Sequence, residues 1–206
     1  MTGARRISRT AVARAGALIV RREGLGSLTV RAVAETLRVT PMALYRHVDS
    51  AAGLRAATLD HILLELASPP GHGTVVERLD VFAHAARTLL RRYPGVARAV
   101  LTEWVALNQG ARIMEALLIV AAEAMPDPQR QVDLANAVFV YVAMRVIAEE
   151  AVLAGGRRRS LPAVAEHPER FPNLLAARTR FARVDTNRHF AIGLDALLAG
   201  LLEHSR

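Results

Sequence analysis

The chain has 206 residues, 52% of them hydrophobic, which is enough for a buried core without a disulfide or a structural metal. It contains no cysteine, which excludes disulfides, thiol nucleophiles and cysteine–metal sites. The formal net charge is +8, and the first fifty residues hold nine arginines against three acids. Such a cationic excess favours polyanions, nucleic acid among them, and the alternative is a solvated arginine-rich face.

Neither a membrane segment nor a secretory signal is expected. There is no run of about 18 uninterrupted apolar residues. Arginines interrupt the first twenty-two residues, where a secretory signal would have an apolar stretch. We therefore expect a cytoplasmic protein.

Alanine, leucine and arginine are the commonest residues, while glycine and proline separate long segments. This pattern predicts an all-α fold with nine or ten helices and no sheet. The first four predicted helices run from Ser8 or Thr10 to about Glu23, from Thr29 to about Leu37, from Thr40 to about Val48, and from Ser50 to Leu66.

Prolines and glycines divide the rest of the chain. A break at Ser68-Pro69-Pro70-Gly71 is followed by helix boundaries at Pro94-Gly95, Gly110 and Pro126 to Pro128. The segment from about Gln129 to Ala154 is apolar on most faces, and a helix of that kind must be buried on all sides. Next we expect a loop of low order at Gly155 to Arg159, prolines at 162, 168 and 172, and a last helix from about Asn187 to His204.

The second and third predicted helices are joined by a tight turn. Thr29 and Thr40 are good N-caps, and Pro41 fits the first position of its helix, where a missing N–H does no harm. Leu44 and Val48 are predicted to hold this helix to the core and to leave its other side chains facing outward. This is the geometry of a helix-turn-helix, in which the second helix reads base edges in the major groove with its first residues.

The same segment resembles the DNA-binding domain of the TetR family of transcription regulators, over about residues 7–66. The strongest matches are Thr29-Val30-Arg31 and Met42-Ala43-Leu44-Tyr45-Arg46-His47-Val48. The last helix carries Phe190-x-x-Gly193-Leu194-x-x-Leu197-x-x-Gly200-Leu201, which is similar to the branch that contains tetracycline repressors. The resemblance implies an N-terminal three-helix helix-turn-helix domain over residues 1–50, a connecting helix to about residue 66, and a C-terminal helical bundle for dimerisation and ligand binding over residues 51–206.

The resemblance also implies which residues contact DNA. Arg31 would meet a phosphate or a guanine edge, and Tyr45 and His47 would bind phosphate, which fixes position without reading sequence. The alternatives are a solvated arginine, a half-buried core tyrosine and a plain helix-terminal histidine. The implied DNA-binding residues are Thr29, Val30, Arg31, Thr40, Pro41, Met42, Ala43, Tyr45, Arg46 and His47.

Two positions depart from the family pattern. Arg38 stands in the turn where the family usually has glycine. A positive φ there costs roughly 1 kcal/mol, so the turn is either strained or differently shaped. Ala51 replaces the usual phosphate-binding lysine, which removes one expected DNA contact.

The segment from Gln129 to Ala154 and the last helix are predicted to form a four-helix interface between two subunits, with a purely internal core as the alternative. Aromatic, soft or polar groups on inward-facing helices are candidates for an effector pocket, although such stripes are more often core, and His84 has Asp80 four residues earlier as a partner. The candidate ligand-binding residues are Phe82, His84, Trp104, Asn108, Met114, Phe139, Tyr141 and Met144.

Enzyme motifs with nucleophile, zinc-binding or nucleotide-binding spacing are missing from the sequence, so we expect no catalytic site, metal or cofactor. We interpret the chain as a regulator, most simply a repressor, that binds a palindromic operator as a homodimer and is released by a small hydrophobic effector. The alternatives are a regulator without a small-molecule effector and an all-helical ligand carrier or enzyme whose basic face is incidental.

Overall fold

The computed structural model of the chain describes residues 7–154, 162–181 and 185–203. Within these ranges it contains eleven α-helices and no strand, which confirms the predicted all-α fold. The helices are α1 (Arg9–Glu23), α2 (Val30–Leu37), α3 (Pro41–Leu44), α4 (Ala51–Leu63), α5 (Val75–Arg91), α6 (Val96–Glu103), α7 (Asn108–Ala122), α8 (Pro128–Ala154), α9 (Pro162–Glu166), α10 (Pro172–Phe181) and α11 (Thr186–Glu203).

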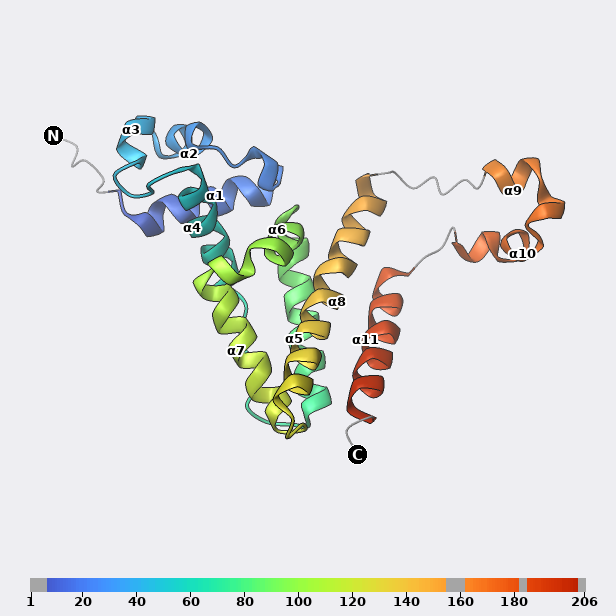
Figure 1. Cartoon of the computed structure of the whole chain (residues 1–206). Coiled ribbons are helices and arrows are strands. Elements are labelled where there is room, and N and C mark those ends of the chain that lie inside the picture. The colour runs from blue at the N-terminus through green and yellow to red at the C-terminus, as the bar shows by residue number, and fades with distance from the viewer. Residues whose placement is uncertain (1–6, 155–161, 182–184, 204–206) are drawn as a thin grey trace.

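The N-terminal helices α1 to α4 gather at one end of the molecule (Figure 1). The Ser8 side chain caps α1 by accepting a hydrogen bond from the Ala11 amide at 3.1 Å. α1 crosses α4 closely at Gly16, where an added Cβ would lie 2.3 Å from Thr58 Oγ1. A side chain at position 16 would therefore push the two helices apart.

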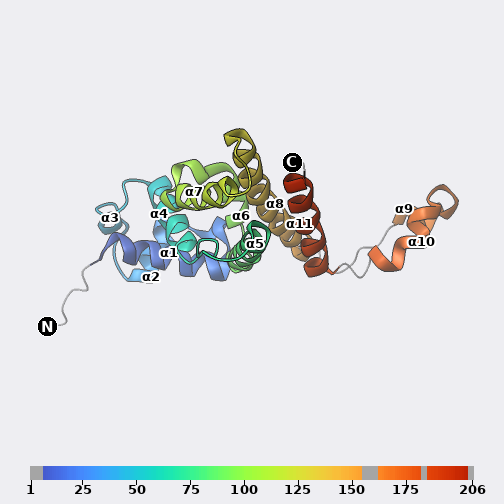
Figure 2. The same cartoon turned by 90° about the horizontal axis from the view of Figure 1, so that it is seen from below.

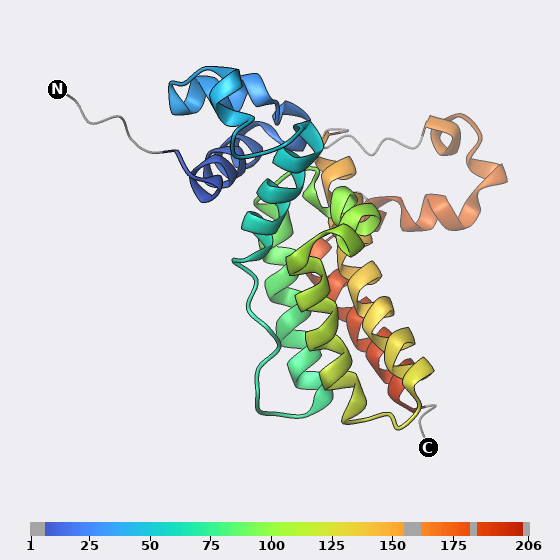
Figure 3. The same cartoon turned by 60° about the vertical axis from the view of Figure 1, so that its left-hand side comes forward.

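The other large helices form a bundle beside this end, and α8 packs against α5, α6, α7 and α11 (Figures 1 and 3). Its inner side carries Leu134 and Val138, which have no solvent exposure. The expectation that this helix is buried on all sides is wrong for a single chain, because Val132, Val140 and Met144 are exposed. Within one chain, α8 has too few neighbours to cover its whole apolar circumference.

Two clusters of buried side chains make up the core. One joins α1, α2, α3 and the start of α4, and the other joins the rest of α4 to the bundle. Leu54 belongs to the first cluster, while Leu59, Ile62 and Leu63 belong to the second. α4 is thus part of both cores, as is α1, whose Ala17 and Val20 belong to the second cluster, and both helices connect the two ends of the molecule.

Two predicted helices end earlier than expected. α3 ends at Leu44, and Tyr45 to His47 form a turn, because the amides of His47 and Val48 share the Leu44 carbonyl at 2.8 and 3.0 Å. α4 ends at Leu63, and a turn rather than an α-helix continues to Leu66. Leu44 and Val48 nevertheless remain on the buried side, at 0% and 2% exposure.

The proline-rich segment after α8 is helical, although no helix was predicted there. Pro162, Pro168 and Pro172 are each the first residue of a helical element, a position where the missing N–H costs nothing. The α9–α10 segment extends away from the bundle (Figure 2). The loop expected at Gly155 to Arg159 and the helix end expected at His204 lie outside the described residues.

In the part of the chain that the structure describes, no single helix combines the length and apolar character that a membrane crossing requires. One pair, Val96–Ala106 with Asn108–Ala122, reaches that composition jointly and is bent by 86°.

Candidate functional site

The α2–α3 unit is built from side-chain caps and two buried anchors. Thr29 Oγ1 accepts from the Ala32 amide at 3.1 Å, and Thr40 Oγ1 accepts from the Ala43 amide at 3.3 Å, so each helix starts where its threonine predicts. Buried Val33 holds α2 to the core as Leu44 holds α3. The local sequence therefore determines which side of this unit faces inward.

All ten predicted DNA-binding residues have side chains with solvent access on this unit or at its caps. Met42 is 74% exposed and Tyr45 is 44% exposed, so part of the tyrosine is covered and part of it is open to solvent. Arg46 is exposed, and Ala43 and His47 are partly exposed. The arrangement leaves a short rod with one free face, of a size that the major groove admits.

Arg31 has a partner that sequence reasoning missed. Its Nε donates to Glu35 Oε1 at 2.9 Å, one helical turn away, and the two side chains are 86% and 65% exposed. Exposed pairs of this kind contribute about 0–1 kcal/mol, so a phosphate or a base can displace the glutamate at little cost. The four-residue spacing of opposite charges was the signal for this pair.

Arg38 resolves the question of the turn. Its φ of 57° and ψ of 48° are left-handed, and it is the one non-glycine residue with positive φ in the described ranges. Its amide donates to the Glu35 carbonyl and the Val39 amide to the Ala34 carbonyl, the pattern that ends a helix through a left-handed residue. The turn therefore keeps its ordinary shape and carries the strain expected of a side chain there.

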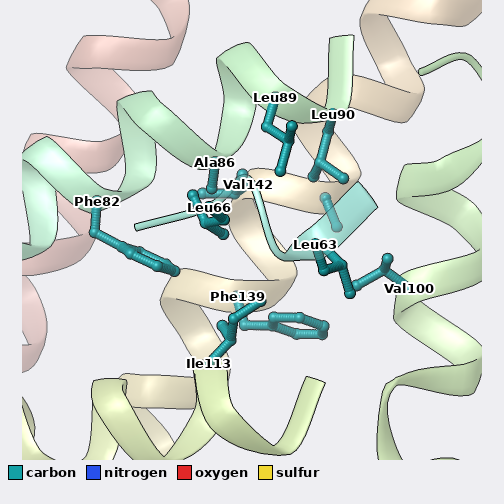
Figure 4. Close-up of a pocket in the computed structure, with 11 residues that line it drawn as sticks. Leu63, Leu66, Phe82, Ala86, Leu89, Leu90, Val100, Ile113, Phe139 and Val142 are labelled. Carbon is teal, nitrogen blue, oxygen red and sulfur yellow. The ribbon is translucent and has the colours of Figure 1, made fainter. Parts of the chain in front are cut away.

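An apolar pocket lies inside the bundle, where the end of α4 meets α5, α6, α7 and α8 (Figure 4). It contains about 390 Å³ of space between atoms, part of it open to solvent. All of its lining residues are aliphatic or aromatic, so it offers no charged or hydrogen-bonding side chain. The lining residues are Leu63, Leu66, Phe82, Ala86, Leu89, Leu90, Val100, Ile113, Phe139, Val142 and Ala143.

Two of the eight candidate ligand-binding residues, Phe82 and Phe139, line this pocket. Trp104 lies at its margin, where its ring packs edge-on against Phe139 with centroids 6.1 Å apart. Met114 packs partly buried against the same core. These four candidates lie in one region of the bundle, but only the two phenylalanines among them line the pocket.

The other four candidates have different neighbours. His84 Nδ1 lies 3.0 Å from the Asp80 carbonyl oxygen and 3.3 Å from Asp80 Oδ1, so Asp80 is its partner, as in the alternative role. Asn108 is exposed and hydrogen-bonds Asp60, and Met144 lies exposed on the outside of α8. Tyr141 donates to the Phe190 carbonyl of α11 at 2.7 Å, and burial raises the pKa of its phenol. These four side chains therefore do not line the pocket.

The pocket residues that were missed are mainly Leu, Ala and Val. They resemble every other core residue in the sequence, and no spacing distinguishes a pocket wall from a filled core. Leu63 and Leu66 matter most among them, because Leu63 ends α4, which also belongs to the N-terminal core, and Leu66 lies in the turn directly after it. No signal in the sequence could have found them.

α8 and α11 lie side by side in opposite directions at the edge of the bundle (Figures 1 and 2). Arg87 of α5 helps to hold this edge, since it forms a buried pair with Glu149 of α8 at 2.8 Å and lies 4.7 Å over the Phe190 ring of α11. The outer sides of the two helices expose Val140, Met144 and Ile192. The edge is thus rigidly supported from within and apolar outside.

The family comparison agrees with this architecture. A model of the tetracyclin repressor-like C-terminal domain matches residues 68–205. No curated protein matches the sequence.

Solved structures share the whole fold. Apo ActR from Streptomyces coelicolor matches with a TM-score of 0.81 at 21% identity, over 97% of this chain and 96% of that chain. BioQ from Mycobacterium smegmatis matches with a TM-score of 0.75 at 24% identity, over 97% of this chain and 99% of that chain. A TetR variant from Acinetobacter baumannii AYE in complex with minocycline matches with a TM-score of 0.73 at 23% identity, over 98% and 99%.

The family match covers about two thirds of the chain, and the solved structures extend the same fold across the N-terminal helices. The resemblance carried by the α2–α3 residues and by the last helix points to the same group of proteins. The chain therefore belongs to the TetR family of transcription regulators.

Proposed function

We propose that the chain binds duplex DNA through the α2–α3 unit and regulates transcription, most simply as a repressor. The observation that carries the proposal is the free face of this unit, where Met42, Tyr45 and Arg46 are exposed while Leu44 is fully buried. A structural relative, BioQ, has been solved with its double-stranded DNA operator. In this proposal residues 1–50 are the DNA-binding domain, and the ten residues named from the sequence form the contact surface.

A homodimer is part of the proposal. Exposed apolar residues lie on two adjacent antiparallel helices, α8 and α11, and the same two helices of a second copy would cover them. A two-fold pair would present two α3 rods to successive major grooves of a palindromic site. Residues 51–206 then form the dimerisation and ligand-binding domain.

The proposed effector is a small hydrophobic molecule, because the pocket is lined by apolar side chains alone. ActR has been solved in complex with actinorhodin and the TetR variant in complex with minocycline, which supports a ligand-binding role for this fold. Phe82 and Phe139 are the side chains proposed to contact a ring in this chain. Effector binding would then weaken DNA binding by a coupling between two sites.

The test is a gel shift with DNA from the promoter of the chain's own gene, with a scrambled duplex of equal composition as the control. We expect tighter binding to the promoter and a loss of affinity as salt rises, because phosphate contacts release counterions. Equal, weak binding to both duplexes at low salt would favour the carrier or enzyme alternative.

The effector is tested separately by a thermal-shift screen of apolar ring compounds. A compound that stabilises the protein and also releases promoter DNA supports the proposed control. If compounds stabilise the protein but never release DNA, the DNA-binding role stands and control by a small molecule does not.

A further inference from the structure

α4 supplies the N-terminal cap of α7. The N-cap residue of α7 is Leu107, whose side chain has no hydrogen-bonding atom. Asp60, from the second half of α4, takes this place: its Oδ1 accepts from the Gln109 amide at 2.8 Å, and its Oδ2 lies 3.3 Å from Asn108 Nδ2. A carboxylate here also faces the positive end of the helix dipole.

α7 in turn supplies the C-terminal cap of α4. Arg112 Nη2 donates to the Leu66 carbonyl at 2.8 Å and to the Leu63 carbonyl at 3.4 Å, and Nη1 lies 3.1 Å from Ser68 Oγ. The Leu63 carbonyl, at the end of α4, also accepts from the Leu66 amide at 3.1 Å, and the Leu66 carbonyl lies in the turn that follows, so the guanidinium binds the backbone on both sides of the helix end. Each helix therefore caps the other: α4 caps the N-terminus of α7, and α7 caps the C-terminal end of α4.

Gln109 joins the two caps into a closed ring. Its amide donates to Asp60, and its side-chain Oε1 accepts from Arg112 Nε at 2.6 Å. The ring runs from Asp60 through Gln109 and Arg112 to the carbonyls of Leu63 and Leu66, and back along α4. The backbones of Leu63 and Leu66 lie in this ring while their side chains line the apolar pocket.

We propose that Asp60, Gln109 and Arg112 are positioning residues that carry a displacement of the pocket wall into the DNA-facing end of the molecule. Apolar helix contacts can slide, whereas directional bonds to both ends of a shared segment make the end of α4 move together with α7. A molecule that pushes on Leu63 or Leu66 then turns α4, whose first half belongs to the core of α1 to α3. The inference rests on the proposed function, because it concerns the coupling between its two sites.

The experiment fills the pocket without an effector. Ala143 and Ala86 are buried and line the pocket from α8 and α5, so Ala143→Leu and Ala86→Leu occupy the space that an effector would take. The probe is a duplex that the wild-type chain selects from a random pool, and its Kd is measured by fluorescence anisotropy. We expect each leucine to weaken binding by about 5-fold or more.

The same leucines are then introduced into Arg112→Leu and Asp60→Ala chains, which open the ring from either side. We expect the fold-change in Kd to approach one in both backgrounds. If the ring residues had only a structural role, opening the ring would lower the stability of the protein, which circular dichroism measures, but it would not alter the fold-change in Kd. Arg98→Leu is the matched control, because it removes an exposed arginine of α6 and should keep the full fold-change.

Each outcome decides something different. The same fold-change with the ring open and closed overturns the coupling role of the ring and leaves the regulator intact. A fold-change of one for both leucines in the wild-type background overturns the transmission from pocket to DNA, and the ring with it. A wild-type chain that selects no duplex overturns the proposed function itself.

Discussion

The two candidate sites are built in opposite ways. In the α2–α3 unit, side chains that hold the fold and side chains available for DNA alternate within one short segment, so Leu44 is buried between exposed neighbours. In the pocket, the lining residues come from five helices and are at the same time members of the core. The DNA-facing site can therefore change without harm to the fold, whereas the pocket cannot.

The largest effect is expected in the pocket. Phe82→Ala removes a buried aromatic side chain and should lower the free energy of unfolding by about 3–5 kcal/mol, measured by urea denaturation. Val105→Ala is the control, since Val105 is exposed and should change stability by less than about 0.5 kcal/mol. If the Phe82→Ala protein were as stable as the wild type, the pocket lining could change without harm to the core, contrary to the comparison above.

Leu44→Ala and Met42→Ala separate fold from function within one helix. Loss of the fully buried Leu44 should cost roughly 2–5 kcal/mol of stability. Met42→Ala should leave the urea midpoint nearly unchanged and weaken binding to promoter DNA. If Met42→Ala instead lowered stability and left DNA binding intact, the outward face of α3 would not be the contact surface.

Arg31→Ala tests whether a residue of α2 reads a base. We expect a loss of about 1–3 kcal/mol in binding to the specific duplex if the guanidinium contacts a guanine edge. An equal loss on a scrambled duplex would indicate a phosphate contact. Glu35→Gln is the companion variant, because it frees Arg31 from its partner and should not weaken binding.

Arg38→Gly tests whether the left-handed backbone at Arg38 costs stability. Glycine adopts the left-handed conformation without a Cβ penalty, so the variant should be more stable by up to about 1 kcal/mol in urea denaturation. Arg38→Ala removes the same charge but keeps the penalty, and it should show no such gain. A gain in both variants would point to charge rather than backbone strain.

The smallest effect concerns a cap in the bundle. Hydrogen bonds from the Thr74 amide and hydroxyl hold the pKa of Glu77 below its ordinary value. A carboxyl with a lowered pKa adds stability above its unfolded pKa and loses it as pH falls through the folded pKa. Glu77→Gln should therefore be less stable than the wild type at neutral pH, and the difference should vanish in acid.

The sequence alone predicted most of the fold, because helix starts depend on nearby residues. Thr29 and Thr40 cap the helices where they were expected to, Ser8 is the one of two candidates that caps α1, and the strained form is the one of two shapes left open for the turn at Arg38. The prolines at 162, 168 and 172 were given no helix, yet each begins a helical element, because proline fits the first position of a helix.

What the sequence by itself determined about this protein is its all-α architecture and the outward face of the α2–α3 unit, because caps, turns and the spacing of buried anchors act over a few residues. Only the tertiary structure decided which apolar residues border a pocket and that Asp60 and Arg112 meet across two helices. Apolar side chains look alike wherever they pack, and contacts between residues some fifty positions apart depend on how whole helices are placed.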